Sequence, residues 1–162
     1  EDSAKAVDAA YQVAGQLPWG YEGIAEFRRL WGMAKVSLPE EAVTYQIAND
    51  LGVKLEEEGN YEESKVFHLA ALEGRRRVLG EEHKKSLESL VCMGALLYEM
   101  EDYEGALDHY QRALRMGEKV MGRTHPDTLS TIMNMASTYK NGLNDFPKAE
   151  EMFRQALDGL ER

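Results

Sequence analysis

Histidines are the first side chains to consider for chemistry, because imidazole serves both in proton transfer and in metal binding. The chain has His68, His83, His109 and His125. No two are four residues apart, the spacing that places two ligands on one face of a helix. His83 and His125 instead occupy equivalent places in a repeat described below, where we expect local turn contacts. The sequence therefore predicts no metal site and no cofactor.

The remaining reactive side chains do not form a recognisable catalytic group. Cys92 lies in the apolar stretch 90–98, which is typical of a buried, unreactive thiol. Adjacent carboxylates, such as the three glutamates at 56–58, point in different directions around a helix and do not converge on one reacting atom. Phosphate-binding, dinucleotide-binding and nucleophile-elbow motifs are missing from the sequence. No catalytic residue, and no enzyme activity, is predicted.

The one basic cluster is the run of three arginines at 75–77. It lacks neighbouring aromatic residues, so it is a poor nucleic-acid patch. We interpret it as a solvent-exposed helix end whose charge complements the helix dipole, and contact with an acidic partner is the alternative.

Composition narrows the class of protein further. The 162 residues fit one domain, and a hydrophobic content of 43% is enough for a core. With 19 basic against 29 acidic residues, the net charge of −10 disfavours nucleic acid and anionic lipid as ligands. No apolar run is long enough to span a membrane, and no signal peptide opens the chain, so direct membrane insertion is not expected.

The sequence leaves the cellular compartment unknown. A single cysteine excludes an internal disulfide, which favours the cytoplasm or the soluble side of an organelle over disulfide-dependent secretion. The chain begins at Glu1 without a methionine, which leaves open a processed product, a fragment or an expressed segment.

The elements that must position any site are helices. Apolar residues recur at spacings of three and four, the period of an amphipathic helix, and strand-like alternation is scarce. A shift of 42 residues places Gly80 on Gly122 and His83 on His125, and the offset becomes 43 after Tyr139.

Each unit is predicted to be two antiparallel helices, for example over 84–100 and 103–121. Pro126 is expected to open the next helix, and Ser37 with Glu40 to form a capping box.

Small and large residues recur in register with this period. Close helix crossings are expected where small residues meet aromatic or imidazole rings. The small residues are Gly52, Gly94 and Ala136, and the rings are His68, Tyr110 and Phe153.

These repeated residues resemble tetratricopeptide repeats, and the 42-residue period resembles the kinesin-light-chain-like subclass. The segments that carry the resemblance are MGRTHPDTL at 121–129, MNMASTY at 133–139 and DYEGAL at 102–107. The resemblance covers about 39–162 and implies an all-α, right-handed α-solenoid with three repeats, at about 39–80, 81–122 and 123–162. Residues 1–38 fit less well and are predicted to form an N-terminal helical hairpin, either a divergent repeat or a cap.

The resemblance also implies that the first helix of each repeat lines a concave groove. The predicted partner-binding residues are Gln46, Asn49, Asp50, Val53, Glu56, Glu88, Val91, Tyr98, Glu99, Ser130, Met133, Asn134, Ser137 and Lys140. The basic clamp of chaperone-binding members is missing, because Glu56 and Tyr98 stand where cations would be needed and only Lys140 is cationic. A basic or amphipathic segment of a protein partner is therefore expected, with a merely solvated face as the alternative.

The two ends of the repeat array are a second candidate surface. The residues predicted to make end contacts are Trp19, Tyr21, Trp31, Met152 and Leu160. The rhythm of the repeat would place another junction just beyond Arg162, so either the protein continues or a partner covers this end. The sequence thus predicts a non-catalytic interaction module, a scaffold or adaptor. The alternative is a constitutive subunit of a larger, multiprotein complex, held through its ends and the N-terminal hairpin.

Overall fold

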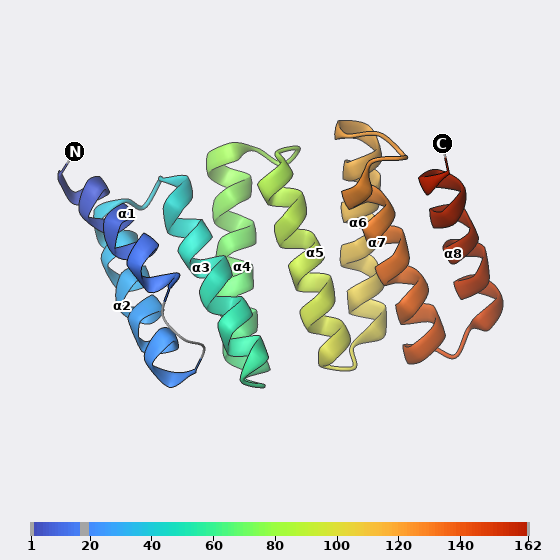
Figure 1. The fold of residues 1–162 in the computed structure, drawn as a ribbon, viewed down its shortest axis with the longest axis horizontal. Coiled ribbons are helices and arrows are strands. Elements are labelled where there is room, and N and C mark those ends of the chain that lie inside the picture. The colour runs from blue at the N-terminus through green and yellow to red at the C-terminus, as the bar shows by residue number, and fades with distance from the viewer. Residues whose placement is uncertain (1, 17–19, 162) are drawn as a thin grey trace. The chain divides into compact units, whose positions relative to one another are not determined.

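In the computed structural model, residues 2–16 and 20–161 are described, and every regular element in them is helical (Figure 1). The all-α fold predicted from periodicity is therefore confirmed. The elements are α1 (Asp2–Ala14), α2 (Tyr21–Ser37), α3 (Ala42–Glu57), α4 (Tyr61–Leu79), α5 (Lys84–Glu99), α6 (Tyr103–Val120), α7 (Pro126–Ser137), the π-helical turn η1 (Thr138–Gly142) and α8 (Phe146–Leu160). None of the helices in the described ranges is long and apolar enough to cross a lipid bilayer.

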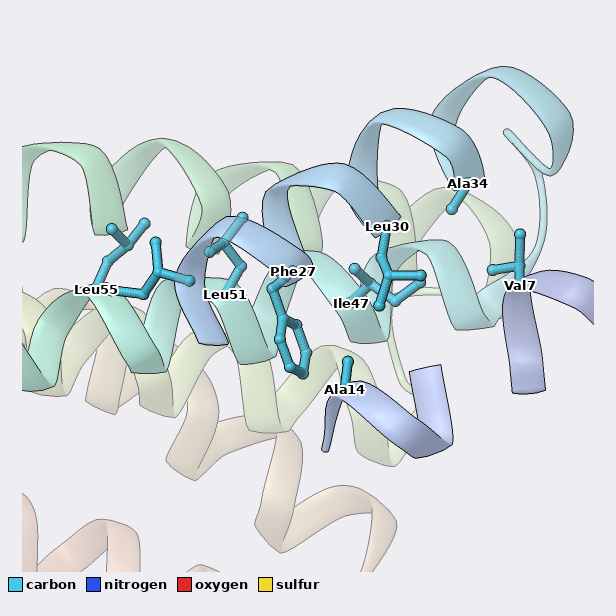
Figure 2. Packing of buried hydrophobic residues seen from close by; sticks show 9 residues of the cluster. Val7, Ala14, Phe27, Leu30, Ala34, Ile47, Leu51 and Leu55 are labelled. Atoms are coloured by element: carbon cyan, nitrogen blue, oxygen red, sulfur yellow. The ribbon is translucent and has the colours of Figure 1, made fainter. Parts of the chain in front are cut away.

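The chain divides into two compact units, Glu1–Glu81 and Glu82–Arg162, called unit 1 and unit 2 below. Unit 1 contains α1–α4, and α3 packs closely on α4. Its core is drawn from α1, α2 and α3, and Figure 2 shows Phe27 and Leu30 of α2 turned toward Ile47 and Leu51 of α3. The N-terminal hairpin therefore shares a hydrophobic core with the next helix. The boundary expected after residue 38 stays a prediction.

In unit 2, α5 packs on α6, α6 on α7, and α7 on α8. Leu129 and Ile132 of α7 form a core with Ala156 of α8. The repeat offset rises from 42 to 43 close to η1, where the Leu143 N–H bonds to the Thr138 carbonyl at 3.2 Å. A π-helical turn holds one residue more than an α-helical turn, so it absorbs the extra residue without disturbing the register of α8.

The small residues of the repeat serve close packing as expected. A Cβ added to Gly94 would lie 2.6 Å from the ring of Tyr110, and one added to Gly52 would lie 2.8 Å from the ring of His68. Real side-chain carbons do not approach so closely, so these crossings require glycine.

The junction histidines act as helix caps. The Lys85 N–H donates to His83 Nδ1 at 3.1 Å, and the Asp127 N–H donates to His125 Nδ1 at 3.1 Å. The predicted local role of both histidines is confirmed, as is Pro126 as the first residue of its helix.

The capping box expected from Ser37 and Glu40 is wrong. Ser37 is the last residue of α2, and Glu41 is the residue that precedes α3. The Leu38 N–H still donates to the Ala34 carbonyl at 2.7 Å, so the preceding helix has not ended where the motif would start a new one. The spacing of three residues between Ser37 and Glu40 does not show where the preceding helix ends.

Candidate functional site

The predicted groove residues of unit 2 lie on α5, α7 and η1, and two hollows form along this face. The first, the junction hollow, has a volume of about 350 Å³. Its lining residues are Lys84, Leu87, Glu88, Val91 and Cys92 of α5 and Asp127, Ser130 and Thr131 of α7. The predicted residues Glu88, Val91 and Ser130 are thus brought together.

Charges around the junction hollow are balanced. Lys84 Nζ lies 2.9 Å from Asp127 Oδ2, and Lys85 Nζ lies 2.9 Å from Glu88 Oε2. The hydrogen bond from Lys84 holds the pKa of Asp127 below its ordinary value, and the same bond raises the pKa of Lys84. Each carboxylate already has a lysine partner, so this hollow has little charge left to attract a ligand.

The second hollow, the aromatic hollow, has a volume of about 330 Å³. It is lined by Ala95, Tyr98, Glu99, Tyr110, Asn134, Ser137 and Asn141. Asn141 Nδ2 donates to Tyr98 Oη at 3.3 Å, which connects the end of α5 to η1. The predicted residues Tyr98, Glu99, Asn134 and Ser137 are gathered here.

The aromatic hollow lies in a negative region. Tyr98 packs edge-to-face on Tyr103, with ring centroids 5.7 Å apart. Glu99 is exposed and makes no ion pair with any residue that the structure describes. Desolvation raises the pKa of Tyr103, and the nearby charges of Glu101 and Glu99 raise it further.

Two predicted residues line neither hollow. Met133 is 45% exposed on α7, and Lys140 is exposed in η1. Met133 offers apolar surface on the helix that helps to line both hollows.

In unit 1 the equivalent positions are engaged inside the protein. Arg75 of α4 is only 1% exposed. Its Nη2 donates to Gln46 Oε1 at 2.7 Å, and its Nη1 donates to Asn49 Oδ1 at 3.3 Å. The interpretation of residues 75–77 as a solvent-exposed helix end is therefore wrong for Arg75, because this side chain turns toward α3. Arg77 does lie exposed, 3.2 Å from Glu40.

Asp50 belongs to the same group of polar side chains. Tyr11 Oη of α1 donates to Asp50 Oδ2 at 2.5 Å, and Gln46 Nε2 donates to Asp50 Oδ1 at 2.8 Å. Burial raises the pKa of Tyr11 far above its ordinary value, and the bond to Asp50 raises it further. We call Tyr11, Gln46, Asn49, Asp50 and Arg75 the Arg75 network.

Sequence reasoning did not identify Tyr11 or Arg75 as functional or structural partners of the groove. A signal was present, because Arg75 lies 42 residues before Gly117, so that a large charged residue stands where the next repeat has a glycine. A large charged residue at such a place predicts polar partners on the facing helix.

The last predicted groove residues of unit 1 lie beside a buried histidine. Val53 and Glu56 are partly buried on α3. His68 of α4 is fully buried, and its Nε2 lies 3.4 Å from Glu56 Oε2. Neither ring nitrogen of His68 has a hydrogen-bond partner among the residues that the structure describes.

The residues predicted to make end contacts differ in where they lie. Trp19 and the side chain of Tyr21 lie outside the described part of the chain. Trp31 is partly buried, with its ring edge-on to Tyr45 and Phe67 at 6.5 and 6.1 Å.

On α8, Met152 packs against the core of unit 2, whereas Leu160 is 63% exposed. Leu157 and Phe153 also stand exposed on α8, at 54% and 38%. The exposed apolar surface of this helix is thus formed by residues other than Met152. No cluster of three or more metal-ligating side chains occurs in the described ranges.

Comparison with known proteins identifies the family to which this helical architecture belongs. Residues 43–119 and 85–162 match the model of the tetratricopeptide repeat family. Among curated proteins, a clustered mitochondria protein homolog of Homo sapiens is 39% identical over 59 residues, which is 36% of this chain and 4% of that protein. The clustered mitochondria protein of Arabidopsis thaliana is 32% identical over 87 residues, 54% of this chain and 6% of that protein. The chain thus spans a small fraction of these relatives.

Solved structures show the same fold. BtubC (BKLC) from P. vanneervenii matches with a TM-score of 0.78 at 24% identity, over 85% of this chain and 55% of that one. A putative kinesin light chain of Podosopora anserina with nearly identical TPR-like repeats matches with a TM-score of 0.74 at 14% identity, over 97% and 86%. The kinesin-light-chain-like architecture expected from the 42-residue period is therefore confirmed at the level of fold. Such repeats generally mediate protein–protein interaction, and the chain belongs to the tetratricopeptide repeat family.

Proposed function

We propose that this chain is a non-catalytic interaction module that binds a basic or amphipathic segment of a partner protein on the α5–α7 face of unit 2. The observation that carries the proposal is the pair of hollows on this face, which gather residues predicted from the repeat register together with the family resemblance. They combine apolar and aromatic surface with polar groups at the edges, the composition of a peptide-binding site.

Charge complementarity supports a cationic partner. The chain has a net charge of −10, and Glu99 and Glu101 are exposed beside the aromatic hollow. Long-range attraction by this field would speed encounter with a basic segment, and the rate would fall as salt is added. Among the described residues of this face, Lys84 and Lys85 are paired with carboxylates and Lys140 is exposed, which is too little positive charge for the basic groove that an acidic peptide would need.

Unit 1 contributes less to this proposal. Gln46, Asn49 and Asp50 are engaged in the Arg75 network, so partner binding there would have to compete with internal hydrogen bonds. We therefore propose unit 2 as the main binding site of the partner segment. Val53 and Glu56 stay as predicted contacts of secondary importance.

The alternative function, a constitutive subunit of a larger complex, is supported by the surface of α7 and α8. A hollow of about 530 Å³ lies along α7 and α8, and its lining combines Leu129 and Ile132, both nearly buried, with charged side chains that include Glu150, Arg154 and Asp158. Exposed Leu157 and Leu160 add apolar surface on α8. Surfaces of this kind are typical of stable contacts between protein subunits.

Affinity purification with three variants separates the two functions. Tyr98→Ala with Glu99→Lys alters the α5–α7 face, Leu157→Ser with Leu160→Ser alters α8, and Glu104→Lys on exposed α6 surface is the charge control. Partners are quantified against the wild-type chain at low and moderate salt. Loss of partners only with the first variant supports the groove, and loss only with the second supports the subunit. Retention by all three variants would contradict both functions.

A further inference from the structure

The two hollows of unit 2 differ in chemistry, although they lie on the same pair of helices. The junction hollow has its carboxylates neutralised by Lys84 and Lys85, and Leu87 and Val91 supply its apolar lining. Leu87 is 4% exposed, so it forms part of the core and offers only its outer edge. A neutral, partly apolar hollow favours an apolar side chain, because a charged one would lose hydration without gaining a partner.

The aromatic hollow favours the opposite kind of side chain. The carboxylate of Glu99 makes no ion pair with any residue that the structure describes, and the partly exposed ring of Tyr98 provides aromatic surface, whereas Tyr110 is 3% exposed and offers only an edge. Lysine and especially arginine bind beside aromatic rings and carboxylates at the same time.

The distance between the hollows follows from the helix that they share. Val91 of the junction hollow and Tyr98 of the aromatic hollow are seven residues apart on α5. Seven residues are nearly two full turns, so both side chains leave the same face, separated by about 10 Å along the axis.

We propose that the partner segment carries one apolar and one cationic side chain about 10 Å apart, the apolar one in the junction hollow and the cationic one in the aromatic hollow. This inference rests on the proposed function and specifies the ligand of the same face. In a polyproline-type extended segment the two side chains are three residues apart, since three residues rise about 9 Å and complete one turn. In a helical segment they are seven residues apart.

Synthetic peptides provide the direct test. One set consists of flexible, proline-containing peptides with a leucine and an arginine separated by two, three or five positions, in both orders along the chain. A second set consists of alanine-rich helical peptides with separations of five or seven. Binding to the full chain is measured by titration calorimetry and by NMR shifts of backbone amides on α5 and α7.

We expect the peptides with separations of three (flexible) or seven (helical) to bind about tenfold more tightly than peptides of the same composition with other separations. Replacing arginine by glutamate in the best peptide should lower its affinity by about tenfold or more, because Glu99 then faces a like charge. Equal binding across all separations, or across the arginine and glutamate peptides, would overturn the inference.

A charge exchange assigns the cation to the aromatic hollow. Glu99→Lys should weaken the arginine peptide and restore the glutamate peptide, whereas the control Glu104→Lys should change neither by more than about twofold. If Glu99→Lys has no effect on this preference, the assignment is wrong.

The two proposals can fail separately. If the natural partner is lost with the Tyr98→Ala and Glu99→Lys variant while no designed peptide binds, the face is a binding site but the two-anchor ligand is wrong. If the peptides bind and the natural partner is retained by that variant, the proposed function is wrong even though the hollows accept the peptides.

Discussion

The same repeat positions have opposite uses in the two units. In unit 1, Asn49 and Asp50 hold hydrogen bonds with Arg75 and Tyr11. In unit 2, the matching positions are Val91 and Cys92, which line an open hollow. Repeat register therefore predicts where a side chain lies, whereas the residues across the helix pair decide whether it is available to a partner.

One difference on the second helices accounts for much of this contrast. Arg75 of α4 corresponds to Gly117 of α6, which is buried beside Leu87 and Thr128. A buried guanidinium must be satisfied by polar atoms, and α3 supplies Gln46 and Asn49. Glycine makes no such demand, and the matching positions Val91 and Cys92 of α5 line a hollow instead.

Arg75→Ala should have the largest effect on the difference between the two units. We expect unit 1 to lose about 3 kcal/mol of unfolding free energy, because Gln46 and Asn49 lose their partner and a cavity is left behind. Urea denaturation followed by circular dichroism measures the loss. Arg76→Ala is the matched control, because Arg76 pairs only with Glu81 at the surface and should cost less than about 1 kcal/mol. Equal losses for the two variants would contradict the Arg75 network.

His68→Phe should make unit 1 resemble unit 2, where Tyr110 and Phe153 occupy the equivalent positions. Both ring nitrogens of His68 are buried without hydrogen bonds to any described residue, so their removal should stabilise the chain by about 1 kcal/mol. The same denaturation experiment measures the gain. A loss of stability would show that the contact of His68 with Glu56 matters more than desolvation of its ring.

Tyr11→Phe tests how α1 is held to α3. The hydrogen bond to Asp50 should contribute about 1 kcal/mol, a value reduced because the phenol is only partly buried. The pKa of Tyr11 is raised by folding, so this contribution is fully present below the ordinary tyrosine pKa and is lost as pH rises through the folded value. Stability of the wild-type chain should therefore fall more steeply above about pH 10 than that of Tyr11→Phe. Parallel curves would exclude this role for Tyr11.

The smallest effect should come from Asp127→Asn, which removes the ion pair across the junction hollow. Both partners are largely exposed, so the pair contributes little and should contribute less as salt is added. Since the pKa of Asp127 is lowered by folding, its share is present above the ordinary aspartate pKa and is lost as pH falls through the lowered value. Thermal unfolding between pH 2 and pH 7, at low and high salt, checks both statements. A salt-independent destabilisation would point to a packing role for Asp127.

Several features followed from the sequence because their causes are local or periodic. The junction histidines cap helices through atoms two residues away, and the glycines at 52 and 94 recur with the aromatic or imidazole rings that need their space. Ser37 shows the limit of local motifs, since the end of α2 depends on hydrogen bonds that continue past it.

The resemblance to tetratricopeptide repeats supplied the face of each first helix on which the candidate residues lie. What the sequence determined by itself was the all-α class and the 42-residue register. These depend on helical period and on repetition, which are properties of the chain read in order. Tertiary structure alone decided that Arg75 is buried, that Tyr11 reaches Asp50, and that the predicted residues of unit 2 gather into two hollows of different charge. The physical reason is that burial and pairing depend on which side chains meet across helices, and residues such as Tyr11 and Asp50, 39 positions apart, meet only in the folded chain.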